Sequence, residues 1–130
     1  MRFVIEEAEY QEKLIIVAGN TTVGTIKGIW KYKQDPVVGG RYQVELSIYY
    51  PSECDIKQDK KLYPSVCLSD DMVIFKGICE DIDEEVYFVR FDVDWLEMIE
   101  IKEIGSNYKK GDVMAFSASY YGVEIYPYTL

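Results

Sequence analysis

Apolar and polar residues alternate with a period of two through most of this chain, and no other feature restricts its fold as strongly. In Arg41–Tyr50 one face carries Tyr42, Val44, Leu46, Ile48 and Tyr50, and the other carries Gln43, Glu45, Ser47 and Tyr49. This is the pattern of a β-strand with one buried face. Similar segments, separated by turn-forming residues, are Phe3–Glu9, Lys13–Ala18, Ile26–Tyr32, Met72–Glu80, Glu85–Val93, Trp95–Ile101, Asp112–Ser119 and Val123–Tyr128.

Strands spaced about 10 residues apart predict an all-β fold, either a small antiparallel barrel of the OB-like kind or a sandwich. The length of 130 residues fits one β domain covering residues 1–130. Only the first segment leaves room for one short helix, because its stretch IEEAEYQEK contains good helix formers. Gly28 and Gly77 lie inside strand patterns, where a glycine usually marks a bulge or a sharp bend of the sheet.

Almost all of the net charge lies in the stretch Glu80–Glu100. It holds nine acidic residues and one basic residue, Arg90, and so nets −8, whereas the whole chain nets −9 from 23 acidic and 14 basic residues. A field concentrated in this way repels nucleic acid and anionic membranes and attracts a basic partner.

The composition argues against an enzyme and favours a binding protein. The chain has no histidine, which removes the commonest acid/base group at neutral pH and every Ser-His or Cys-His pairing. We expect no metal, because the acidic run lacks the central glycine and distal glutamate of a calcium loop. We also expect no other cofactor. The three cysteines lack zinc-site spacing, and neither a signal peptide nor an apolar span is present, so we expect a cytoplasmic protein with reduced thiols.

The acidic stretch is the candidate partner-binding surface. A turn around Asp81, Asp83, Glu84 and Glu85 connects two strands, and Asp92, Asp94 and Glu97 extend the charge beyond it. Tyr87 and Trp95 lie close by in sequence and would serve as apolar anchors if exposed. Buried aromatic anchors inside a charged rim are the usual anatomy of a protein-binding hot spot. The simpler interpretation is a solvated turn, since acidic residues form turns readily.

Two other binding functions remain open. An OB-like barrel binds single-stranded nucleic acid with lysines and stacking aromatics, here Lys27, Lys31, Lys33, Trp30 and Tyr32. However, the lysines alternate with the aromatics, which favours a wet lysine face over a buried Trp30. The second alternative is a phage-type inhibitor of host defence that mimics nucleic acid with its carboxylates.

The stretches VGGRYQVELSI and KKGDVMAFSASYYGVEIYPY, together with the small size and the local acidic run, resemble bacterial immunity proteins. Those proteins accompany the toxins of polymorphic and contact-dependent growth-inhibition systems. The resemblance implies a cytoplasmic inhibitor that binds its cognate toxin domain, often a basic nuclease, and blocks it by occlusion. It implies no catalytic chemistry, and it leaves the target and the oligomeric state open.

Overall fold

The computed structural model describes residues 1–54, 64–101 and 107–128, which form eleven β-strands and one 3-10 turn. The elements are β1 Arg2–Gln11, β2 Leu14–Thr21, β3 Gly24–Trp30, β4 Arg41–Ile48, β5 Ser52–Glu53, β6 Ser65–Ser69, β7 Met72–Asp83, β8 Val86–Asp92, β9 Trp95–Glu100, β10 Val113–Ser119, η1 Tyr120–Gly122 and β11 Val123–Tyr128. The all-β prediction is confirmed, and the first segment is a strand. Within the described ranges, no helix has the length and apolar character needed to cross a membrane.

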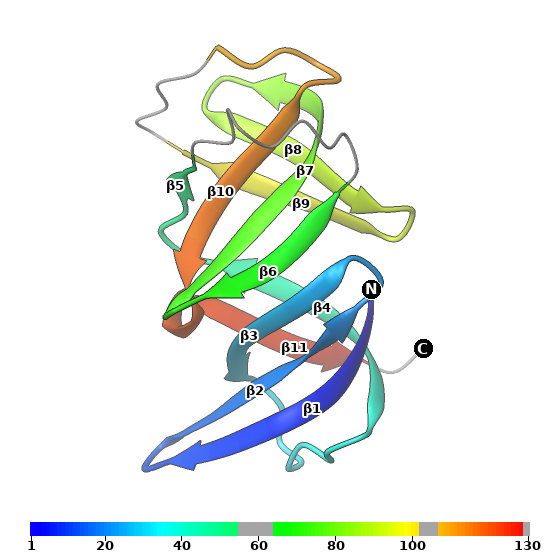
Figure 1. The fold of residues 1–130 in the computed structure, drawn as a ribbon, viewed down its shortest axis with the longest axis vertical. Coiled ribbons are helices and arrows are strands. Elements are labelled where there is room, and N and C mark those ends of the chain that lie inside the picture. Colours follow the sequence, from blue (N-terminus) through cyan, green and yellow to red (C-terminus); the bar gives the residue numbers. More distant parts are fainter. Residues whose placement is uncertain (55–63, 102–106, 129–130) are drawn as a thin grey trace.

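Five strands close into a barrel, which decides between the two predicted architectures. β1, β2 and β3 form an antiparallel meander, and β4 pairs with β1 at one side and with β11 at the other. β11 then pairs in parallel with β3, with Glu124 opposite Ile29, and this pairing closes the ring. In Figure 1 these strands form the lower half of the molecule.

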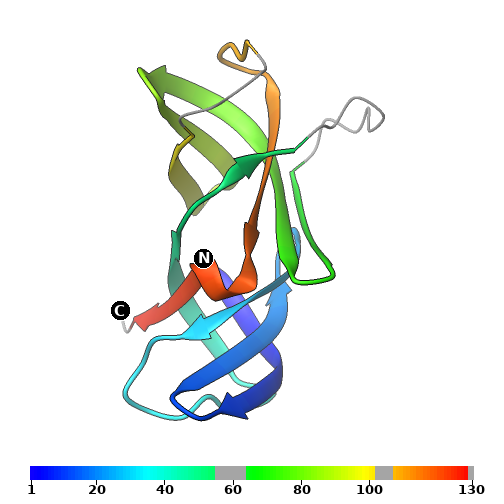
Figure 2. The same cartoon turned by 90° about the vertical axis from the view of Figure 1, so that its left-hand side faces the viewer.

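The remaining strands belong to a long insertion between β4 and β11. β7 lies at its centre, with β10 along one edge and β6 and β8 along the other, and β9 follows β8. β5 pairs with β10. The insertion forms the upper half in Figures 1 and 2. It leaves the barrel after Ile48 and returns at Val123, and these two residues are register partners. The sequence pattern missed β5 and β6 because both are short.

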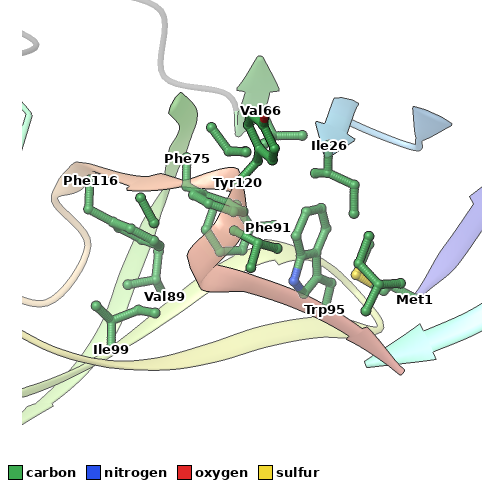
Figure 3. Packing of buried hydrophobic residues seen from close by; sticks show 14 of the residues in the cluster. Met1, Ile26, Val66, Phe75, Val89, Phe91, Trp95, Ile99, Phe116 and Tyr120 are labelled. Carbon is green, nitrogen blue, oxygen red and sulfur yellow. The ribbon is translucent and has the colours of Figure 1, made fainter. Parts of the chain in front are cut away.

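One hydrophobic cluster joins the barrel and the insertion. Phe75 stacks on Phe116 with a centroid distance of 5.0 Å, and the ring of Phe91 lies 4.7 Å from that of Trp95. Figure 3 shows that the Trp95 ring continues this aromatic row toward Met1 and Ile26 of the barrel. The insertion therefore covers an end of the barrel with aromatic side chains and does not have a separate core.

The glycines inside the strand patterns lie where another strand passes very close. A Cβ atom on Gly28 would lie 2.5 Å from the carbonyl oxygen of Val123, at the start of the closing strand β11. A Cβ atom on Gly77 would lie 2.6 Å from a methyl carbon of Val89 on β8. Both distances are below van der Waals contact, so these positions accept only glycine without a shift of the neighbour.

Candidate protein-binding groove

The first group of predicted residues lies at the tip of the β7–β8 hairpin. Asp83 pairs with Val86, so Glu84 and Glu85 form a two-residue turn, and all three acidic side chains are exposed. Asp81 lies further down β7, where its carboxylate is 3.3 Å from the ammonium of Lys110. The backbone N–H of Ile82 and the Lys110 ammonium both donate to Asp81 and lower its pKa. The tip is therefore solvated, and one of its acids is already paired.

The basic residue of the acidic stretch is also paired internally. Arg90 on β8 donates from Nε and from Nη2 to the two carboxylate oxygens of Glu80, at 2.9 and 3.2 Å. This bidentate bond lowers the pKa of Glu80 and raises that of Arg90. Glu80 lies at a β-bulge, where the register of β7 against β8 shifts. The pair neutralises part of the charge that the sequence concentrates here.

The second group of predicted residues lies in the β8–β9 turn, at the opposite end of β8. The Thr22 hydroxyl and the backbone N–H of Val93 donate to Asp92 and lower its pKa. The Asp94 carboxylate is 4.0 Å from the Met1 amino group. Both contacts fasten the turn to the barrel, near the N-terminus in Figure 1.

The two acidic groups do not form one surface. β8 has seven residues, and at about 3.3 Å per residue it separates the hairpin tip from the β8–β9 turn by about 20 Å. Asp81 and Glu97 lie between these ends, opposite Phe88 and Val89, whose side chains point to opposite faces of the sheet. The prediction of a continuous acidic patch that runs from Asp81 to Glu97 is therefore corrected: the acidic residues are spread along β8 and over both faces.

Neither predicted anchor is exposed. Tyr87 is 8% exposed and Trp95 is 3% exposed. Tyr87 shares the inner face of β8 with Val89 and Phe91, and Trp95 packs against the Phe91 ring. Their assignment as partner-contacting residues is corrected: both belong to the core.

A groove of about 570 Å³ lies between β4 and β9, where sequence reasoning did not place a site. Its walls are the consecutive residues 44–49 and 94–99, with Met1 and Tyr128. A second cavity of about 810 Å³ lies beside it, lined by residues 48–53 and by Met98, Glu100 and Ile101. The two cavities share Ile48, Tyr49 and Met98 and so form one continuous depression, called here the β4–β9 groove.

Acidic side chains line this groove on both of its sides. Glu45, Asp94 and Glu97 border the first cavity, and Glu53 and Glu100 border the second. The described lining residues include no lysine or arginine, and their positive charge is the amino group of Met1. Three of the five acids come from the charged stretch, but Glu45 and Glu53 reach the groove from distant parts of the chain.

Glu97 is the most perturbed carboxyl of the groove. Its pKa is raised to about 7, mainly by burial and to a smaller extent by the charge of Glu45. The Trp95 indole donates to its carboxylate from Nε1 at 2.9 Å, and this bond and the Met1 ammonium act in the opposite direction. At neutral pH this carboxyl is therefore about half ionised, and a cation in the groove favours the ionised form.

Large apolar side chains stand open to solvent around the same groove. Tyr49 is 48% exposed, Met98 is 66% exposed and Tyr50 is 92% exposed. Tyr50 also has a φ of 54°, in the left-handed region. That conformation is rare for a bulky residue and costs free energy. Backbone strain is common at functional sites, so Tyr50 is a candidate contact residue of this groove. The sequence carried one signal for it, the Tyr49-Tyr50 doublet that breaks the alternation before Pro51.

Three of the residues proposed for nucleic-acid binding, Trp30, Lys27 and Lys31, make contacts within this protein instead. Trp30 is buried and donates from Nε1 to the Gln34 carbonyl at 2.8 Å, so its ring is not available to stack on a base. The Lys27 ammonium lies 4.2 Å from the centre of the Tyr120 ring. The Lys31 ammonium lies 3.7 Å from the Glu124 carboxylate.

In the part of the chain that the structure describes, no group of three or more cysteine, aspartate or glutamate side chains is arranged to hold a metal ion. Neither the models of known protein families, nor the curated proteins, nor the solved structures include a match to this chain.

Proposed function

We propose that this protein binds a basic segment of another protein in the β4–β9 groove and blocks that protein by occlusion, as an immunity protein does its toxin. The observation that carries the proposal is the lining of one groove by five carboxylates and several exposed apolar side chains. Carboxylates steer and orient a cationic partner, and the apolar side chains supply area that is buried on contact. The groove replaces the hairpin tip as the proposed site, and Asp94 and Glu97 stay part of it.

The position of the groove in the fold supports the same function. It begins where the chain leaves β4, at the connection between the fourth and fifth barrel strands. Barrels of the OB-like kind use this connection, with that between the first two strands, to bind oligonucleotides and oligosaccharides. This is an analogy at the level of the fold, and the chemistry of the groove decides what is bound. With carboxylates on both walls, the favoured ligand is a cationic peptide rather than a nucleic acid.

Reversing groove charges is expected to weaken binding far more than reversing tip charges. The probe is a blocked, fluorescent octapeptide that alternates lysine and valine, and its affinity is measured by anisotropy. In the double variant Glu45→Lys and Asp94→Lys we expect a loss of about 30-fold at low salt, because two attractive charges become repulsive. The control variant, Asp83→Lys with Glu85→Lys, changes the net charge equally, from −9 to −5 (−9 + 4). We expect it to lose less than about threefold.

If the two variants lose the same amount of peptide affinity, only the overall charge matters, and the groove is not the binding site. Failure of the lysine peptide to bind the unmodified protein would lead to the same conclusion. The association rate is also expected to fall about tenfold when the NaCl concentration is raised to about 300 mM. Coexpression with the product of the adjacent gene tests whether this protein inhibits a toxin. We expect the unmodified protein to rescue growth and the groove variant to fail to rescue it.

Tyr50 is expected to contribute to binding at a cost to stability. Tyr50→Gly removes the strain of a positive φ and should raise the free energy of unfolding by about 1 kcal/mol. The same change should weaken peptide binding about tenfold, because the exposed ring is lost. Tyr50→Ala is the matched control, since it removes the ring and keeps the strain: it should bind as weakly without the gain in stability. Binding of Tyr50→Gly at full affinity would remove Tyr50 from the site.

A further inference from the structure

The β4–β9 groove lies between two strand edges whose backbone groups have no partner strand among the described strands. We infer that the partner segment binds in extended form, as a β-strand added between β4 and β9; this deepens the proposed function and rests on it. Among the described strands, β9 pairs only with β8. The backbone N–H of Ile101 donates to the Glu85 carbonyl at the β8 side. Since backbone groups alternate along a strand, those of Met98 and Glu100 point away from β8, toward the open edge.

β4 presents a second open edge to the same groove. The Val44 N–H donates to the Met1 carbonyl at 2.9 Å, which places this group on the β1 side, and the pairing of β4 with β1 reaches no further. The Tyr49 N–H donates to the Gly122 carbonyl on the opposite, β11 side. By alternation, the backbone groups of Leu46 and Ile48 face the β1 side beyond Val44, where no described strand pairs with them.

The two edges run in the same direction along the groove. Met1 contacts Val44 in the first half of β4 and Asp94 just before β9. Further along both segments, Tyr49 after β4 lines the second cavity together with Met98 and Ile101. One added strand can therefore pair antiparallel with both. Strand addition draws affinity from the backbone and specificity from alternate side chains. Here every second side chain of the guest meets carboxylates such as Glu97 and Glu45, which selects a segment that alternates lysine or arginine with apolar residues.

Amide hydrogen exchange measured by NMR tests the inference with the same lysine-valine octapeptide. At saturation we expect exchange at Leu46, Ile48, Met98 and Glu100 to slow by at least about tenfold, because their N–H groups gain partners. Ser47 and Ile99, whose backbone groups already face paired strands, serve as internal controls and should change little. A second peptide, methylated on alternate backbone nitrogens, keeps every charge and loses half of its strand donors. We expect it to bind at least about tenfold more weakly.

The results separate this inference from the function on which it rests. If the methylated peptide binds equally well and the four edge amides exchange as before, strand addition is wrong. A groove that still loses binding on charge reversal would then hold the partner through side chains alone. If charge reversal has no effect either, the proposed function falls with it.

Discussion

Alanine at Gly24 is expected to destabilise the protein by roughly 3 to 5 kcal/mol, as for other substitutions that combine a clash with backbone strain. Gly24 has a φ of 138°, which side chains rarely adopt, and a Cβ atom would lie 1.9 Å from the Val66 carbonyl oxygen. Gly24 pairs with Val66 where β3 meets β6, and the Val66 N–H donates to the Val23 carbonyl beside it. The methyl group therefore forces apart the junction of barrel and insertion.

Urea unfolding followed by tryptophan fluorescence measures this effect, since Trp30 and Trp95 are both buried. Gly39→Ala is the matched control, because Gly39 has a φ of 84° and nothing lies within 4 Å of its added Cβ. It should cost only about 1 to 2 kcal/mol, for the backbone conformation alone. If Gly24→Ala lowers the free energy of unfolding no more than Gly39→Ala does, Gly24 and Val66 are not in close contact at this junction.

Glu97→Gln is expected to stabilise the protein by up to about 3 kcal/mol at pH 8 and to have little effect below pH 4. The pKa of Glu97 is raised from 4.5 to about 7 in the folded state. Between these values the folded protein holds a proton that the unfolded chain has released. The free energy of unfolding therefore falls as the pH rises from about 4.5 to about 7. Glutamine stays neutral and removes this loss, and its amide oxygen can still accept from Trp95.

The measurement is the free energy of unfolding of both proteins across this pH range, supported by an NMR titration of the Glu97 carboxyl. Glu100→Gln is the control, because it removes the same charge from an exposed position on the same strand. We expect its effect to stay below about 0.5 kcal/mol at every pH. A stability difference between Glu97→Gln and the unmodified protein that does not change with pH would contradict the buried, protonated carboxyl.

The same proton links stability to binding. A cationic partner beside Glu97 favours the carboxylate, so binding near pH 6 should release a proton. Calorimetry in buffers of different ionisation enthalpy measures that release.

Local sequence patterns predicted the strands and their faces well, because alternation is a property of neighbouring residues. Val44 is buried and Glu45 is exposed, as the pattern of Arg41–Tyr50 requires. The order of strands was beyond such patterns: the parallel pairing of Glu124 with Ile29 joins distant residues and decides between barrel and sandwich.

The site was predicted less well, because acidic residues that are close in the sequence need not be close in the folded protein. An extended strand moves successive residues apart, so β8 carries the hairpin tip and Asp94 to opposite ends. The acids that do come together, Glu45 and Glu97, are far apart in sequence. Tyr87 and Trp95 could be assigned to the core only once the inner face of the sheet was known. The positive φ of Tyr50 has no counterpart in a residue pattern.

The insertion has a consequence for how proteins of this design can diversify. Its two ends meet at one point of the barrel wall, the pair formed by Ile48 and Val123. A graft at that point leaves the pairing of the five barrel strands with one another in place. It has to rebuild the contact of β6 with β3, where the Val66 N–H donates to the Val23 carbonyl, and the aromatic lid that includes Trp95. The insertion therefore enters and leaves the barrel wall at a single point, and a replacement has these two contacts with the barrel to restore.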